Sequence, residues 1–234
     1  MKKIINSTIL FIYLANSIGF AQNRNTQFAT EVFINNADIY DTGSLYDSTT
    51  PENYVGTPYY LNDFLLGDVF LENKLILGKG ALRYNAIADE IEYKESLNDN
   101  DESAKALVKS KEIYVKIMND TFVFVPNQGY FLVILDGNNL SLLKKVTKKY
   151  FPPKKARNNY ERSTLARFED RFTYTIYSKK GKILELPRSK SKKIKAFGDD
   201  EKIVTSYTKK QNLDLNNEKD IKKLIQYLDN IQGF

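Results

Sequence analysis

The chain contains no cysteine, no histidine and no tryptophan among its 234 residues. Without cysteine there are no disulfides, no thiol chemistry and no iron–sulfur ligation, so packing alone must hold the fold. Without histidine, Ser-His-Asp and Cys-His catalysis and histidine-based zinc sites are excluded. The glycine pair Gly78 and Gly80 lacks the third glycine or the Lys-Ser/Thr sequel of a phosphate-binding loop. Carboxylates are therefore the catalytic groups that remain.

The first residues have the pattern of a secretory signal peptide. Lys2 and Lys3 form a basic start, an apolar run extends to Phe20, and Gly19-Phe20-Ala21 is a small-x-small cleavage site. We expect cleavage after Ala21 and a mature chain outside the cytoplasm, in the periplasm or the extracellular space. The alternative is an N-terminal membrane anchor, for which the run is short. No later run is long enough to span a membrane, so we expect no transmembrane segment in the mature chain.

The clearest strand signals lie between residues 112 and 145. Residues 113–117 alternate between apolar and polar side chains, which indicates a strand with one buried face. Residues 130–135 form a continuous apolar run that suits a central strand. The sequence Asp-Gly-Asn-Asn at 136–139 favours a tight hairpin turn. Neighbouring strands joined by tight turns predict an antiparallel meander.

Similar runs occur on both sides of this stretch, and the hydrophobic period becomes helical near the end of the chain. We predict a mainly β (α+β) fold, an antiparallel β-meander of roughly ten strands with C-terminal helices. The predicted divisions are a signal peptide at 1–21, a β-rich domain at 22–188 and a helical C-terminal segment at 189–234 packed on the β-body.

The segment 217–231 has the clearest helical pattern. Its apolar residues fall on one stripe of the helix and are Ile221, Leu224, Ile225, Leu228 and Ile231. A helix this short is marginal alone, so we expect the stripe to dock on the β-body. The alternative is a stripe that stays exposed for a partner.

The charges are distributed unevenly along the chain. Residues 22–143 carry 9 basic and 18 acidic side chains, whereas residues 144–210 carry 21 basic and 7 acidic ones. Such asymmetry is typical of proteins that bind a polyanion or a membrane surface. The alternatives are that the two halves attract each other, or that the charges are simply solvated.

The basic segment interleaves its cations with aromatic residues, as surfaces that bind polyanions do. We predict an anionic-partner surface whose candidate residues are Lys144, Lys145, Lys148, Lys149, Lys154, Lys155 and Arg157. An exported protein seldom meets nucleic acid, so we expect none as a partner. We favour an anionic envelope component, such as lipopolysaccharide or a polysaccharide, or an acidic protein. The alternative is that the aromatic residues belong to the core and the cations are solvated.

Two acidic clusters remain as candidates for chemistry. Asp89, Glu90 and Glu92 are close in sequence, and paired carboxylates hydrolyse glycosidic bonds when a cleft holds them at a set separation. The usual alternative is the wet face of a strand with its salt bridges. Residues 98–102 offer oxygen ligands for calcium but lack the glycine and the distal glutamate of an EF-hand. These patterns assign no catalytic residue, metal or cofactor.

Four parts of the chain resemble uncharacterised exported proteins common in Bacteroidetes. They are GTPYYLNDFLLGDVFLENK, ALRYNAIADEIEYK, GYFLVILDGNNLSLLKK and the closing helical tail. The resemblance rests on Gly56, Pro58, Tyr59, Phe64, Gly67, Val69, Leu82 to Asn85, Asp89 to Glu92, Gly129 to Phe131, Gly137 and Leu142 to Lys145. It covers most of the mature chain and implies export and a β-rich body, but no activity and no catalytic residues.

Together these features predict a non-catalytic exported protein that binds an envelope or cell-surface partner. The alternative is a carboxylate-based, glycosidase-like hydrolase that uses Asp89, Glu90 or Glu92.

Overall fold

The computed structural model describes residues 54–158 and 160–231. Within them the chain is mainly β, with one large sheet of 11 strands and helices at the C-terminal end, which confirms the predicted fold class. The predicted signal peptide lies outside the described residues.

The strands are β1 (Tyr54–Val55), β2 (Leu65–Leu71), β3 (Lys74–Asn85), β4 (Glu90–Lys94), β5 (Lys105–Ala106), β6 (Ile113–Ile117), β7 (Asp120–Val125), β8 (Gly129–Asp136), β9 (Leu140–Phe151), β10 (Ala166–Ser178) and β11 (Ile183–Leu186). The helices are the 3₁₀ turns η1 (Asp101–Ser103) and η2 (Gly198–Asp200), and α4 (Lys190–Lys195), α5 (Glu201–Lys210) and α6 (Glu218–Asn230). The predicted boundary at residue 188 therefore lies between β11 and α4.

The order of strands in the sheet is β1-β10-β9-β8-β7-β6-β2-β3-β4-β5, and β11 pairs with β10. From β6 to β10 each strand pairs antiparallel with the next, as the tight turns predict. Two pairings depart from the expected antiparallel meander. Strand β2 pairs antiparallel with β6, which is not its neighbour in sequence, and β1 runs parallel to β10 with Tyr54 opposite Ala166. A two-residue strand has no period that a sequence pattern could reveal, so the pairing of β1 was not foreseen.

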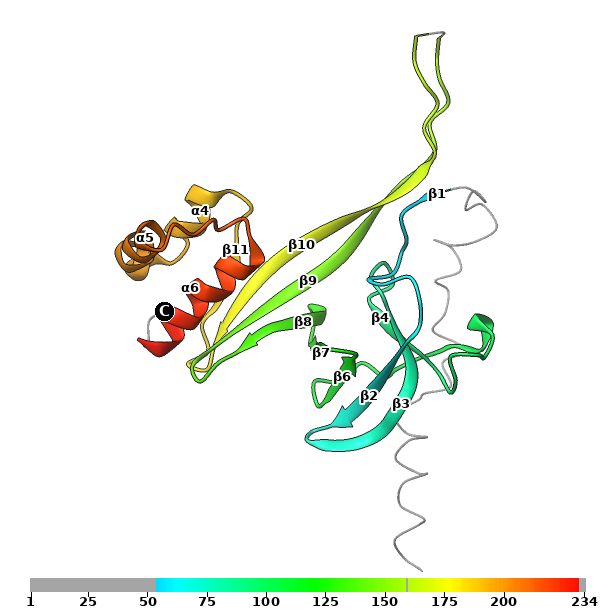
Figure 1. The fold of residues 1–234 in the computed structure, drawn as a ribbon, viewed down its shortest axis with the longest axis horizontal. Helices are drawn as coiled ribbons and strands as arrows, with labels where there is room; N and C mark the ends of the chain where they lie inside the picture. Colours follow the sequence, from blue (N-terminus) through cyan, green and yellow to red (C-terminus); the bar gives the residue numbers. More distant parts are fainter. Residues whose placement is uncertain (1–53, 159, 232–234) are drawn as a thin grey trace, which may run out of the picture.

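The buried side chains form two hydrophobic cores. The first lies among β2, β3, β4, β6, β7 and β8, and its most buried members include Val69, Leu82, Ile91, Val115 and Phe122. The second joins the inner ends of β9 and β10 to the helices and includes Leu140, Leu142, Ile176, Val204, Leu224 and Leu228. Figure 1 shows the helices at one end of the molecule, β2 to β4 at the other, and the long strands β9 and β10 between them.

Helix α6 is held on the sheet by the apolar stripe that the sequence shows. Four of its five members are buried, namely Ile221, Leu224, Ile225 and Leu228, and α6 packs against β9. The fifth, Ile231, is 43 % exposed just beyond the helix. At the start of α6 the side chain of Asn217 accepts a hydrogen bond from the N–H of Lys219, which is the capping geometry expected of asparagine.

The carboxylate of Asp229 ties the last turn of α6 to the hairpin turn between β8 and β9. It accepts hydrogen bonds from the backbone N–H groups of Asn138 (2.9 Å), Asn139 (2.6 Å) and Leu140 (2.8 Å). Burial by itself raises the pKa of a carboxyl group, but these three donors outweigh it and hold the pKa of Asp229 below its usual value. The turn and the helix therefore stabilise each other through one charged group.

Replacing Leu224 by alanine should lower the free energy of unfolding by about 2–5 kcal/mol, because it removes a fully buried side chain and leaves a cavity. Chemical denaturation measures the change. The matched control is Ile231→Ala at the exposed end of the stripe, which should change stability by less than about 0.5 kcal/mol. Equal, small effects for both variants would contradict the docking of α6.

Replacing Asp229 by asparagine should cost about 2 kcal/mol at neutral pH, because hydrogen bonds to a charged acceptor are lost. A carboxyl group with a lowered folded-state pKa contributes stability above its unfolded pKa and loses it as the pH falls through its folded pKa. The difference between wild type and Asp229→Asn should therefore shrink below about pH 4. Urea denaturation at several pH values measures it, and a difference that stays constant down to pH 2 would contradict this role.

Candidate functional site

The long hairpin of β9 and β10 continues well beyond the rest of the sheet. The two strands pair without interruption from Leu140 opposite Ser178 to Phe151 opposite Arg167. Strand β8, however, accompanies β9 only as far as Lys144. We call residues 149–158 and 160–169 the outer hairpin. Apart from the two-residue strand β1, it is a two-stranded ribbon among the described residues, and Figure 1 shows it projecting from the body.

Three of the seven residues predicted to face an anionic partner lie on the inner part of β9 and form ion pairs. Lys144 pairs with Glu218 on α6 at 2.8 Å. Lys145 pairs with Asp89 at 2.9 Å, and Lys148 pairs with an aspartate across the ladder on β10. These cations are mostly buried and already paired. Lys144 and Lys145 hold the hairpin to its neighbours, and Lys148 holds its two strands together.

The other four predicted residues lie together on the outer hairpin and are exposed to solvent. They are Lys149, Lys154, Lys155 and Arg157. The returning side of the hairpin adds two cations that the prediction did not include, the exposed Arg162 and the partly exposed Arg167, which pairs with Glu169 at 2.9 Å. Residues 149–167 thus carry six basic side chains and one acidic side chain, a net charge of +5.

The end of the hairpin is ordered by its own hydrogen bonds. The backbones of Lys154 and Thr164 exchange two N–H···O bonds of 3.0 and 2.8 Å, which extends the ladder past the strands. Beyond them, the side chain of Asn158 accepts the N–H of Glu161 at 3.0 Å. The carboxylate of Glu161 accepts the backbone N–H of Arg157 at 3.3 Å. The one acidic group is therefore directed at the backbone, and the cations around it stay available.

The aromatic residues of the hairpin divide between packing and exposure. Phe168 is buried between two tyrosine rings at centroid distances of 5.4 and 5.2 Å, so it belongs to the fold. Phe151 instead has the ammonium of Lys149 at 4.8 Å and the guanidinium of Arg167 at 4.4 Å from its ring centre, both cation–π contacts. Tyr160 is 98 % exposed. The alternative that these aromatics form the core holds for Phe168 but not for the other two.

The carboxylate of Asp89 has a structural environment. It accepts the hydroxyl of Tyr84 at 2.8 Å and the backbone N–H of Tyr130 at 3.0 Å, besides pairing with Lys145. Burial, followed by the charge of Asp89, raises the pKa of Tyr84. Gly129 lies so close that a Cβ atom there would overlap the Asp89 carboxylate. These contacts fasten the turn before β4 to β3, to the start of β8 and to β9.

Glu92 belongs to a second, separate network around Arg83. The guanidinium of Arg83 is 2.7 Å from the Glu92 carboxylate and lies between the rings of Tyr59 (3.6 Å) and Phe64 (4.0 Å). Glu90 pairs elsewhere, with a lysine at 3.6 Å. Each of the three candidate catalytic carboxylates therefore has its own cation, whereas a hydrolase needs two that face each other across a cleft.

The candidate calcium loop is occupied by a side chain of the protein itself. The ammonium of Lys94 donates to the backbone oxygen of Asp99 and to the carboxylate of Asp101, both at 2.7 Å. The hydrogen bond from Lys94 and the charge of Arg83 hold the pKa of Asp101 below its usual value. Within the described ranges, no cluster of three or more acidic, histidine or cysteine side chains is placed to hold a metal ion.

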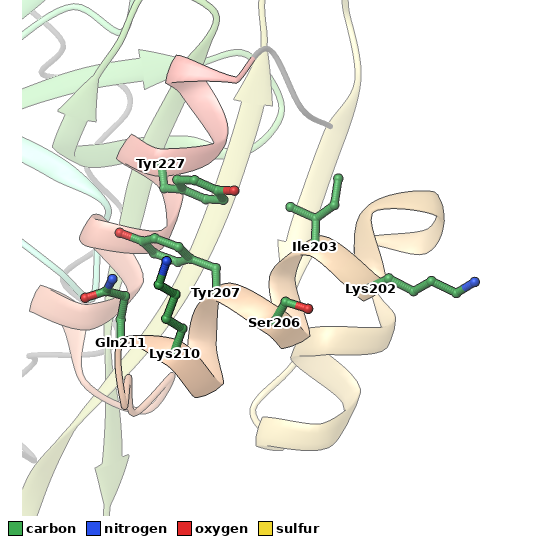
Figure 2. A pocket seen from close by; sticks show the side chains of 7 residues that line it. All are labelled: Lys202, Ile203, Ser206, Tyr207, Lys210, Gln211 and Tyr227. Atoms are coloured by element: carbon green, nitrogen blue, oxygen red, sulfur yellow. The ribbon is translucent and has the colours of Figure 1, made fainter.

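An open groove of about 400 Å³ lies on the helices, between α5 and α6. Figure 2 shows the rings of Tyr207 and Tyr227 against each other in it, and they stack at 3.8 Å with their planes 2° apart. The stack joins the two helices. The groove residues are Lys202, Ile203, Ser206, Tyr207, Lys210, Gln211 and Tyr227, so this groove does not offer the pair of carboxylates that the hydrolase alternative needs.

No protein-family model, curated protein or solved structure matches the chain. Among the described helices, none is long and apolar enough to cross a membrane. A function must therefore come from the geometry above, in which the outer hairpin is an exposed basic surface and Asp89, Glu92 and Asp101 are each paired with a cation of the fold.

Glu92→Gln should lower the free energy of unfolding by about 3 kcal/mol, because it leaves the buried guanidinium of Arg83 without its nearest counter-charge. Thermal or chemical unfolding measures this loss. Glu95→Gln, an exposed change of the same kind close in sequence, should have almost no effect. A Glu92 variant as stable as the Glu95 variant would show that this network does not hold the fold.

Proposed function

We propose that this protein is a non-catalytic exported protein that binds an anionic component of the cell envelope through its outer hairpin. The observation behind the proposal is a set of exposed cations on a two-stranded ribbon that extends from the body. Lys149, Lys154, Lys155 and Arg157 lie on one side of the hairpin, and Arg162 lies on the other. Exposed charges of one sign attract an oppositely charged partner over about a Debye length.

Binding accounts for this arrangement better than catalysis does. The inner lysines of β9 are paired with acidic residues, whereas Lys154, Lys155 and Arg157 on the outer hairpin are exposed to solvent. The carboxylates that would have to catalyse hydrolysis are each engaged by a different cation. Nothing in the described part of the chain favours the hydrolase over the binding protein.

The proposed location rests on the sequence. The basic start, the apolar run and the small-x-small site at Ala21 support export to the periplasm or beyond. The resemblance to exported proteins of Bacteroidetes supports the same location. An exported protein meets anionic lipid and polysaccharide at the envelope, which is consistent with a basic binding surface.

A heparin column tests the proposal, since heparin is a soluble polyanion. The wild-type protein should be retained at low salt and released as salt rises, because screening weakens contacts between exposed charges. The triple variant Lys154→Gln, Lys155→Gln, Arg157→Gln should elute at clearly lower salt.

The matched control is Lys192→Gln, Lys195→Gln, Lys209→Gln, which removes the same charge from exposed positions on the helices. It should elute close to wild type. No retention of the wild type, retention that survives about 1 M salt, where the Debye length is about 3 Å, or equal losses for both triple variants would contradict binding by the hairpin.

A further inference from the structure

We infer that the end of the outer hairpin docks on the surface of a lipid bilayer that carries anionic headgroups. This inference rests on the proposed function and names its partner. We call residues 154–158 and 160–165 the tip. The inference depends on three features of the tip, namely an exposed aromatic ring, the cations around it, and its position at the end of a ribbon.

The first feature is Tyr160, whose side chain is 98 % exposed. Its backbone is nevertheless fixed, because its N–H donates to the side chain of Asn158 at 3.0 Å. Leu165, on the returning side of the tip, is 55 % exposed. A tyrosine has an apolar ring and a polar end, and such rings lie at membrane interfaces at the level of the headgroups. A fixed turn thus presents an interfacial side chain to solvent.

The second feature is the charge around this ring. Lys154, Lys155, Arg157 and Arg162 are all exposed on the tip. The one carboxylate there, that of Glu161, is held by a backbone N–H of the tip. Clusters of four to eight lysine and arginine side chains recognise anionic lipid surfaces, and each added cation strengthens that attraction. Basic and aromatic side chains on the same short segment match a surface that is charged outside and apolar beneath.

The third feature is the shape of the presenting element. The tip is the far end of a two-stranded ribbon, and Figure 1 shows it standing clear of the sheet and the helices. A flat surface can therefore meet the tip without meeting the body. A stable complex with a folded protein usually buries about 800 Å² on each partner, with shape complementarity at its centre. A narrow turn offers little such area, whereas a fluid layer of headgroups needs no complementary shape.

The absence of tryptophan from the chain gives a direct experiment. Tyr160→Trp introduces a single fluorophore at an exposed position where the fold does not depend on the side chain. With vesicles of phosphatidylglycerol its emission should shift to shorter wavelength, because the ring leaves water. The shift should be absent with phosphatidylcholine vesicles and should be reversed by salt. Adding the triple change Lys154→Gln, Lys155→Gln, Arg157→Gln should abolish it.

The control fluorophore is Tyr114→Trp on β6, where the native ring stacks on Phe70 far from the tip (Figure 1). It should show no shift with either vesicle. Sedimentation of the protein with phosphatidylglycerol vesicles and no shift at position 160 would overturn tip docking. Retention on heparin without binding to vesicles would overturn the bilayer as partner and leave an anionic polysaccharide of the envelope, with the proposed function intact. Failure to bind either probe would overturn both.

Discussion

The pairing of β9 with β10 is the interaction on which the rest of the structure depends. Its ladder runs unbroken from Leu140 and Ser178 to Phe151 and Arg167, which is long for a hairpin in a domain of this size. The inner end of the ladder contributes Leu142 and Ile176 to the helical core. Further out, Val146 joins the core of the other strands. One hairpin therefore connects both cores, and only its outer end is free to act as a binding element.

The alternation of side chains along β9 directs its inner lysines to different parts of the molecule. The backbone of a strand is pleated, so the side chains of neighbouring residues point to opposite faces. Lys144 reaches Glu218 on the helices, whereas Lys145, on the other face, reaches Asp89 before β4. The two ion pairs connect the same strand to different parts of the molecule. Of the alternatives for the uneven charge, attraction between acidic and basic parts of the chain thus applies to the inner hairpin.

Sequence patterns predicted local structure well where each element is defined by its own residues. The turn at 136–139 and the buried stripe of α6 are both of this kind, because turn chemistry and helical period are local properties. Residues 148–151 have no strand pattern of their own, yet β9 continues to Phe151. Pairing with β10 extends β9 to this residue. The local sequence of a strand does not show which strand it pairs with. For the same reason Arg162 and Arg167 were not included in the predicted surface.

Most of the residues on which the proposed resemblance to exported Bacteroidetes proteins rests lie inside the molecule. Arg83, Glu92, Asp89 and Gly129 form the buried networks that fasten β3, β4 and β8, and Tyr59 covers one face of the Arg83 guanidinium. None of the residues from 148 to 170 is among them. Such a pattern specifies a fold, because a buried charge or a glycine under a carboxylate has few replacements. An exposed ribbon has many, so its residues can change without loss of the fold.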